Sequence, residues 1–201
     1  MFAQNEILVF TPGRKQECLD RLAWIHSLMA PQPGFKEAIV AKYLGDGTRH
    51  TIMRFWEDEA AYQAFRATPD GSYGRNRPEG LYVNEPVVTP LVSFGEATGA
   101  ATGNFLIKLE RTVEPSAWDA FLAHANGVLA NAPKIPGLAW AAGFRGKDKD
   151  ANITLIRMSG RDALEDMLET PMIAAAMTLP EGVTQVRFEC FEIVSEVFPK
   201  Q

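Results

Sequence analysis

The strongest constraint on the fold of this chain is an element order that occurs twice along its 201 residues. Alternating apolar residues predict strands, and apolar residues spaced three or four apart predict amphipathic helices. The first half has predicted strands at 6–12, 35–44, 48–56 and 81–94 and helices at 14–30 and 57–67, with a loop at 69–80. The second half has predicted strands at 105–113, 138–145, 152–159 and 183–198, a helix at 115–132, and one helix or two short ones at 161–179.

Two pairs of sequence markers support an internal repeat. Pro136-Gly137 follows Pro33-Gly34 by 103 residues, and each pair comes directly after a predicted helix. Arg157 follows Arg54 by the same 103 residues, each inside the third predicted strand of its half. Similarity at a constant spacing is typical of a duplicated unit.

A strand-helix-strand-strand-helix-strand unit forms a four-stranded antiparallel sheet with both helices on one face. The other face of each sheet must also be covered. The sequence therefore predicts the α+β class, with two tandem ferredoxin-like repeats whose antiparallel sheets pack face to face as a dimeric α+β barrel, an intrachain pseudo-dimer. The predicted domains are residues 1–95 and 105–201, joined by a polar linker at 96–104. Whether two chains also form a homodimer stays open.

The net charge of −5 and the pI of about 5.3 argue against nucleic acid and anionic membranes as partners. No apolar run approaches the roughly 20 residues of a membrane span. The N-terminus has no secretion-signal pattern, so we expect a cytoplasmic protein in which Cys18 and Cys190 stay free thiols. The three histidines lack metal-ligand spacing, so no metal is expected.

The first half resembles a known family. Its helix leads into Pro33-Gly34-Phe35, its third strand ends Arg54-Phe55-Trp56, and the run Glu57-Asp58-Glu59-Ala60-Ala61-Tyr62-Gln63-Ala64-Phe65 follows. These features resemble the antibiotic biosynthesis monooxygenase (ABM) family of the dimeric α/β barrel superfamily. The resemblance covers about residues 5–94, whereas residues 103–198 match only in layout.

The resemblance implies several functional classes. Some family members oxygenate polycyclic phenols with no metal or flavin, some bind and degrade haem, and related proteins are stress-response or isomerase-like proteins. The oxygenase pattern is retained at Trp56 and Tyr62, but its substrate-holding Asn is replaced by Ile52. The position of the haem-ligating His is Arg66, which weakens the haem hypothesis.

Period-2 alternation places His50, Arg54 and Trp56 on one face of the third predicted strand. His26 lies on the apolar stripe of the first predicted helix. If that stripe packs on this strand face, these side chains and Tyr62 line one cleft suited to a flat aromatic ligand. The alternatives are core packing for His26, Trp56 and Tyr62, and a surface pair for His50 and Arg54.

These residues lead to one functional hypothesis with two alternatives. The chain is predicted to be a cofactor-independent monooxygenase acting on a small phenolic or quinone-like substrate. His26 or His50 would deprotonate the phenol, with Trp56 at the same site, and Arg54 would stabilise the phenolate. Tyr62 and Trp24 would contact the substrate, although core packing is the alternative for Trp24.

The first alternative is a non-catalytic small-molecule-binding or stress-related protein, and the second is haem binding. The second repeat, which lacks the Trp, is predicted to be mainly structural.

Overall fold

The computed structural model describes residues 1–73, 78–147, 150–170 and 177–200. It divides into two compact units. Unit 1 comprises Met1–Leu91 together with Ile193–Gln201, and unit 2 comprises Val92–Glu192.

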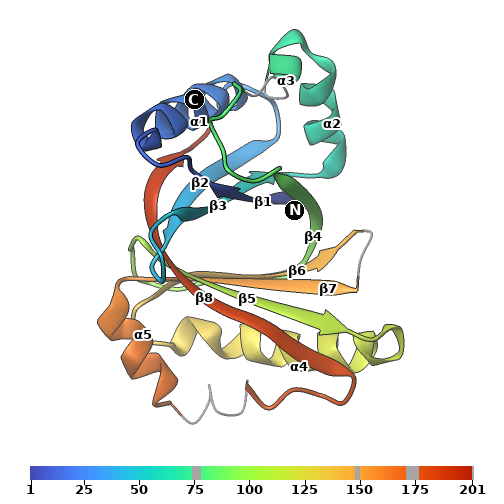
Figure 1. Ribbon diagram of the computed structural model, residues 1–201. Coiled ribbons are helices and arrows are strands. Elements are labelled where there is room, and N and C mark those ends of the chain that lie inside the picture. The colour runs from blue at the N-terminus through green and yellow to red at the C-terminus, as the bar shows by residue number, and fades with distance from the viewer. Residues whose placement is uncertain (74–77, 148–149, 171–176, 201) are drawn as a thin grey trace. The chain divides into compact units, whose positions relative to one another are not determined.

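Unit 1 contains an antiparallel sheet in which β3 lies between β1 and β2. Helices α1 and α2 cover one face of this sheet (Figure 1). The C-terminal residues return to unit 1, where Val197 packs on the core and the Lys200 N–H donates to the Ala30 carbonyl. The elements are β1 Phe2–Val9, α1 Lys15–Met29, β2 Phe35–Tyr43, β3 Arg49–Trp56, α2 Glu59–Ala67, α3 Pro69–Tyr73 and β4 Val87–Thr98.

Unit 2 repeats this arrangement, with β7 between β5 and β6. The N-terminal part of β8 pairs with the free edge of β5, and β4 is the neighbour of β6. Helix α4 lies along one face of the sheet, together with α5 (Figure 1). The elements are β5 Phe105–Val113, α4 Trp118–Asn131, β6 Leu138–Gly146, β7 Ala151–Met158, α5 Arg161–Leu168 and β8 Val183–Val197, with 3₁₀ turns at Pro115–Ala117 and Ala132–Lys134.

The two units share the same turn after their first helix. Gly34 and Gly137 have φ angles of 76° and 75°, a left-handed conformation that favours glycine. The Gly34 carbonyl accepts a hydrogen bond from the Glu57 N–H at 2.7 Å, and the Gly137 carbonyl accepts one from the Ser159 N–H at 2.8 Å. The predicted fold class, α+β with two tandem ferredoxin-like repeats and antiparallel sheets, is confirmed.

The predicted correspondence between Arg54 and Arg157 is wrong by one residue. Arg54 lies opposite Gln4 on β1, and the residue in the same register of unit 2 is Ile156, opposite Ile107 on β5. The spacing between repeats is therefore 103 residues up to the second strand and 102 from the third strand onward. Because side chains alternate along a strand, this single step places Arg157 on the opposite face from Arg54.

Two strand boundaries differ from the sequence prediction. β1 begins at Phe2, four residues before the predicted start, because the polar residues Gln4 and Asn5 pair with β3 and are buried. β4 begins at Val87 rather than 81, because residues 81–83 pair with the end of β1 only through the isolated bridge Phe10–Tyr82, and the Asn84 side chain then bonds β1. Its Oδ1 accepts from the Val9 N–H at 2.7 Å, and its Nδ2 donates to the Ile7 carbonyl at 3.0 Å.

Other segments also depart from the predictions. The predicted loop 69–80 begins with the short helix α3, and its residues 74–77 lie outside the described residues. β4 extends to Thr98, three residues into the predicted linker 96–104. The predicted segment 161–179, one helix or two short ones, contains α5 at Arg161–Leu168, while 171–176 lie outside the described residues. The predicted repeat boundaries, 1–95 and 105–201, stay a prediction.

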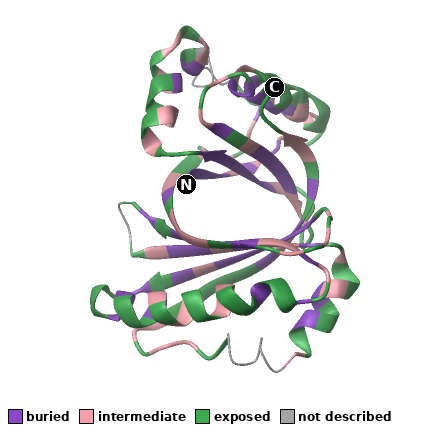
Figure 2. Cartoon of the chain, turned by 180° about the vertical axis from the view of Figure 1, so that it is seen from behind, coloured by how far each residue is buried: buried purple, intermediate pink, exposed green. Residues whose placement is uncertain are grey.

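Strands carry most of the buried residues, whereas the outer helix faces are exposed (Figure 2). In unit 1, two apolar clusters fill the layer between the helices and the sheet. In unit 2, one cluster lies under α5 and the end of α4, and another lies around Trp118 and Phe121. The layer between helices and sheet is thus where each repeat is packed, and where its candidate site residues lie.

Substitution of the turn glycines tests their role. A Cβ on Gly137 would lie 2.5 Å from the Ala163 Cβ, in addition to the left-handed φ. We expect Gly137→Ala to lower the free energy of unfolding by at least about 1 kcal/mol, measured by urea denaturation. Gly127→Ala is the matched control, because Gly127 is exposed on α4 with no atom near its added Cβ. Gly127→Ala should raise the free energy of unfolding by about 0.5–1 kcal/mol. Equal losses of stability in both variants would contradict the role given to Gly137 in the turn.

Candidate functional site

The face of β3 that carries His50, Arg54 and Trp56 does pack under the helices of unit 1. All three side chains are buried there. The structure places them in three separate groups along the strand, so they do not line one cleft with His26 and Tyr62.

The first group is a buried polar network of Glu6, Arg54 and His26. The Arg54 Nη1 donates to the Glu6 Oε2 at 2.7 Å, and its Nε donates to the His26 Nε2 at 3.2 Å. All three residues are at least 93% buried. Burial, followed by the nearby Arg54 charge, holds the pKa of His26 well below its usual range. His26 is therefore neutral, and its one basic nitrogen already accepts a hydrogen bond.

The second group is an aromatic cluster around Trp56, which is fully buried. Its ring centroid lies 5.3 Å from that of Phe35, 5.4 Å from that of Phe65 and 6.0 Å from that of Tyr62. These distances are typical of core aromatic packing. The structure thus favours the core interpretation of Trp56 over a role in lining a cleft.

The third group is His50 at the opposite end of β3. Its ring stacks on Phe10 with centroids 3.8 Å apart, and its Nδ1 lies 3.0 Å from the Thr48 carbonyl oxygen. That contact makes Nδ1 the protonated nitrogen. Burial lowers the pKa of His50 to about 4.

Trp24 joins none of these groups. It is 41% exposed on α1, and the guanidinium of Arg21 lies 4.4 Å from its ring centroid. The core interpretation of Trp24 is wrong, because its position on α1 points away from the buried face formed by Leu22, Ile25 and Met29.

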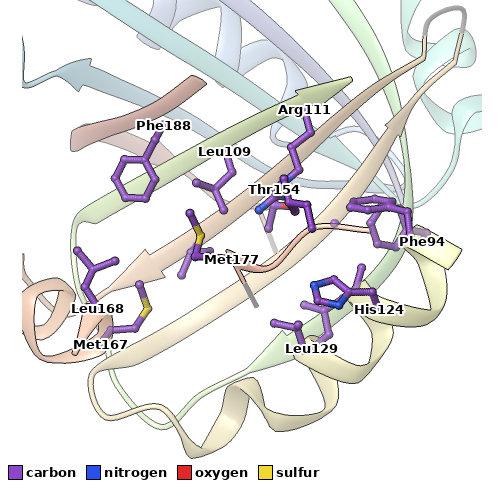
Figure 3. Close-up of a pocket in the computed structure, with 16 residues that line it drawn as sticks. Phe94, Leu109, Arg111, His124, Leu129, Thr154, Met167, Leu168, Met177 and Phe188 are labelled. Carbon is purple, nitrogen blue, oxygen red and sulfur yellow. The ribbon is translucent and has the colours of Figure 1, made fainter. Parts of the chain in front are cut away.

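Unit 2 contains a pocket in its own layer between helices and sheet (Figure 3). We call it the second-repeat pocket. It leaves about 80 Å³ for the centres of water-sized molecules, whereas one water needs roughly 10–15 Å³ by this measure. Its lining is mostly apolar: Phe94, Leu109, Arg111, Phe121, His124, Ala125, Val128, Leu129, Gly143, Thr154, Ile156, Met167, Leu168, Met177, Leu179 and Phe188.

The strand register shows how the packing of this layer differs between the two units. Gly143 lies opposite Thr154, as Val40 lies opposite Ile52 in unit 1, so a valine has been replaced by a glycine. A Cβ at Gly143 would lie 2.2 Å from the Phe94 ring, so this glycine lets that ring lie against the sheet.

Side-chain volume is also smaller on the helix that covers the pocket. The 103-residue spacing pairs Leu22 of α1 with Ala125 of α4. Leu22 is part of the unit 1 core, whereas Ala125 lines the second-repeat pocket. The Ala125 side chain thus leaves part of the pocket open where unit 1 has the larger Leu22.

The polar network of unit 1 has no counterpart in unit 2. Glu6 and Arg54 correspond in register to Leu109 and Ile156, and the helix spacing pairs His26 with Leu129. All three unit 2 residues are apolar and line the pocket.

Two polar residues of the pocket instead take apolar places of unit 1. Arg111 occupies the register of Leu8, and Thr154 occupies that of Ile52. The Arg111 Nη1 donates to the Thr154 Oγ1 at 3.0 Å and to the Asn152 Oδ1 at 3.3 Å. Burial lowers the pKa of Arg111 to about 10. His124 enters the pocket from α4 (Figure 3).

Sequence reasoning missed the second-repeat pocket and treated its repeat as mainly structural. One signal was present, because Phe105, Ile107, Leu109 and Val113 alternate along β5 and Arg111 stands on the same face. A charged residue on a buried strand face is rare unless it is paired or functional.

Within the described ranges, no group of three His, Cys, Asp or Glu side chains could hold a metal ion. None of the helices in the described part of the chain is long and apolar enough to cross a membrane.

The fold and the pocket define a two-repeat ferredoxin-like α+β protein whose second repeat has a mostly apolar pocket between helices and sheet. Residues 1–71 match the family model described as Antibiotic biosynthesis monooxygenase, ABM. The match lies within the first repeat, and the resemblance predicted from its residues is confirmed.

Solved structures similar to this chain span nearly its whole length. A candidate monooxygenase from Lactobacillus acidophilus has a TM-score of 0.77 and 11% identity, covering 98% of this chain and 95% of its own. A candidate monooxygenase from Fusobacterium nucleatum has a TM-score of 0.82 and 7% identity, covering 98% of this chain and 94% of its own. An anthrone oxidase-like protein has a TM-score of 0.67 and 13% identity, covering 100% of this chain and 94% of its own. At these identities the likeness shows the fold alone, and no curated protein matches the sequence.

The Glu6–Arg54–His26 network can be tested with the residues of unit 2. We expect Glu6→Leu alone to lower the free energy of unfolding by about 3–5 kcal/mol, because it leaves Arg54 buried without its carboxylate. The triple variant E6L/H26L/R54I introduces the residues found at Leu109, Leu129 and Ile156. Urea denaturation should place it within about 1 kcal/mol of the parent or above it. A triple variant as unstable as the single one would contradict the correspondence.

The burial of neutral His50 predicts a loss of stability in acid. Its pKa is lowered to about 4, so the unfolded chain binds the proton first as the pH falls below about 6.5. The stability that the protein has with His50 buried and neutral is present in full above pH 6.5 and is lost as the pH falls towards 4. Relative to His50→Gln, the parent should lose about 2 kcal/mol of stability over this window, measured by urea midpoints. His124→Gln is the comparison variant. A stability difference between parent and His50→Gln that stays constant with pH would refute the prediction.

Proposed function

We propose that this protein is an ABM-type monooxygenase that oxygenates a small aromatic substrate in the second-repeat pocket, without a bound cofactor. The observation that carries the proposal is an open, mostly apolar pocket in the layer between helices and sheet of unit 2. The ABM domain of the first repeat supports the reaction class.

The pocket suits a flat aromatic molecule. Phe94 of β4 and Phe188 of β8 line it, and Met167 and Met177 add adaptable apolar surface (Figure 3). Phe121 of α4 also lines the pocket. A pocket with many apolar walls and few polar groups is the usual form of a small-molecule site.

Oxygenation without a cofactor requires the substrate itself to reduce O₂. A phenol or an anthrone-type compound can do this once a base removes a proton, because the resulting anion is electron-rich. Oxidation of an anthrone-type methylene to a carbonyl consumes one O₂ and releases one water, so no other reductant is needed. Likeness to the anthrone oxidase-like fold supports this choice of substrate. His124 is the pocket residue suited to accept the proton.

The roles predicted for the first repeat stay predictions. In the structure, His26 is held by Arg54 and Trp56 is packed in the core. These contacts favour a structural role for both residues and leave the chemistry to the second repeat.

The proposal is tested by O₂ consumption with a panel of hydroxyanthrones and naphthols. We expect His124→Gln to lower kcat by about 100-fold or more, because general-base catalysis contributes at least that much. His26→Leu is the matched first-repeat variant and should retain most of the activity of the parent. Loss of activity in His26→Leu with full activity in His124→Gln would move the reaction to the first repeat.

Small-molecule binding without turnover is the second candidate function. The Ile at position 52, where the oxygenase pattern has Asn, favours it. Thermal stabilisation by the same compounds without O₂ consumption would select this function. A Soret band on addition of haem would instead select haem binding.

A further inference from the structure

Arg111 is a buried cation in an apolar pocket. Its side chain extends from β5 beside Thr154 (Figure 3) and is 6% exposed. A guanidinium has five N–H donors. The two acceptors that Arg111 reaches, Thr154 Oγ1 and Asn152 Oδ1, both lie at Nη1 and both are neutral.

The charge of Arg111 is not balanced by a carboxylate among the residues that the structure describes. Its Nε is buried with no acceptor within the described ranges. Burial alone lowers the pKa of Arg111, with no acidic group opposing the shift. A buried charge without a counter-ion costs several kcal/mol, so folded proteins usually pair it.

The first repeat shows the paired form of the same arrangement. Arg54 is also buried in the layer between helices and sheet, but the carboxylate of Glu6 lies 2.7 Å away. The first repeat therefore supplies its own anion. In the second repeat the residue in the register of Glu6 is Leu109, and a pocket lies beside the cation.

We propose that the second-repeat pocket binds an aromatic oxyanion, a carboxylate or a phenolate, with its charged oxygen at Arg111 and Thr154. The ring packs against Phe94, Phe121 and Phe188. This proposal deepens the proposed function by naming the charge of the ligand, and it takes from that function only the location of the site. A planar guanidinium matches the two oxygens of a carboxylate, and a charge-assisted hydrogen bond strengthens when water is excluded.

Benzoate and benzamide form the decisive pair of probes, because they share size and shape and differ in charge. Binding to the parent protein is measured by calorimetry or NMR titration under anaerobic conditions, so that no turnover interferes. We expect benzoate to bind at least about tenfold more tightly than benzamide. Equal affinities, together with no change in the apparent pKa of bound 4-nitrophenol, would overturn the proposal, whatever the behaviour of any variant.

Three variants assign the preference to Arg111. Arg111→Met keeps the length of the side chain and should bring the ratio of the two affinities to about one, whereas Arg111→Lys should retain the preference for benzoate. Arg145→Met is the control for net charge, because Arg145 is exposed on β6 with its guanidinium 4.1 Å from the Trp118 ring centroid. A ratio unchanged in Arg111→Met, or lost equally in Arg145→Met, would overturn the assignment.

The phenolate arm uses 4-nitrophenol, whose ionised form absorbs visible light. Binding to the parent should lower the apparent pKa of the phenol by about one unit, which corresponds to a tenfold preference for the anion. The shift should disappear in Arg111→Met. A preference for benzoate without this shift assigns the site to carboxylates, and the shift without that preference assigns it to phenolates.

Thermal melting separates ligand binding from a structural role. Without ligand, Arg111→Met should melt at a higher temperature than the parent, since it removes an unbalanced buried charge. An arginine needed for folding would give the opposite result.

The two proposals fail in different ways. Preference for the anion without O₂ consumption would refute the oxygenase and leave the anion site intact. Turnover with no preference for charge would refute the anion site alone.

Discussion

Burial of a charged side chain between helices and sheet is the constraint that distinguishes the two repeats. In unit 1, Arg54 is buried next to Glu6, and its charge is satisfied by a residue of the same chain. In unit 2, Arg111 is buried beside a pocket and bonds only neutral partners among the described residues. A buried charge must find a counter-ion or destabilise the fold. Glu6 supplies the counter-ion of Arg54 within the core of unit 1. In the proposed site of unit 2, the ligand supplies the counter-ion of Arg111.

The two repeats thus use one backbone arrangement for different purposes. The turns at Gly34 and Gly137 are the same, and the strands pair in the same order. The difference arises from side-chain volume and charge at corresponding positions, such as Leu22 and Ala125. Duplication permits this division, because one repeat can keep a solid core while the other exchanges stability for a cavity. The second-repeat pocket therefore lies in the repeat that the family model does not match.

Much of the fold could be predicted because its signals are local. Turn glycines, apolar periodicity and the order of elements depend on neighbouring residues, and each appears in the sequence of both halves. Alternation along the third strand placed His50, Arg54 and Trp56 on one face, but it left open whether that face meets the helices. It could not show that these side chains separate into three groups, because helix packing decides which side chains meet. The alignment of Arg157 with Arg54 was wrong because one residue fewer separates the second and third strands of unit 2.

The sequence by itself determined the duplicated α+β architecture and the resemblance of the first half to the ABM family. Only the tertiary structure decided that His26 and Arg54 bond each other, that Trp56 lies in the core, and that a pocket opens beside Arg111. The physical reason is that a cavity is a missing volume. It depends on several side chains, far apart in the chain, failing together to fill one space, and no local pattern records that sum.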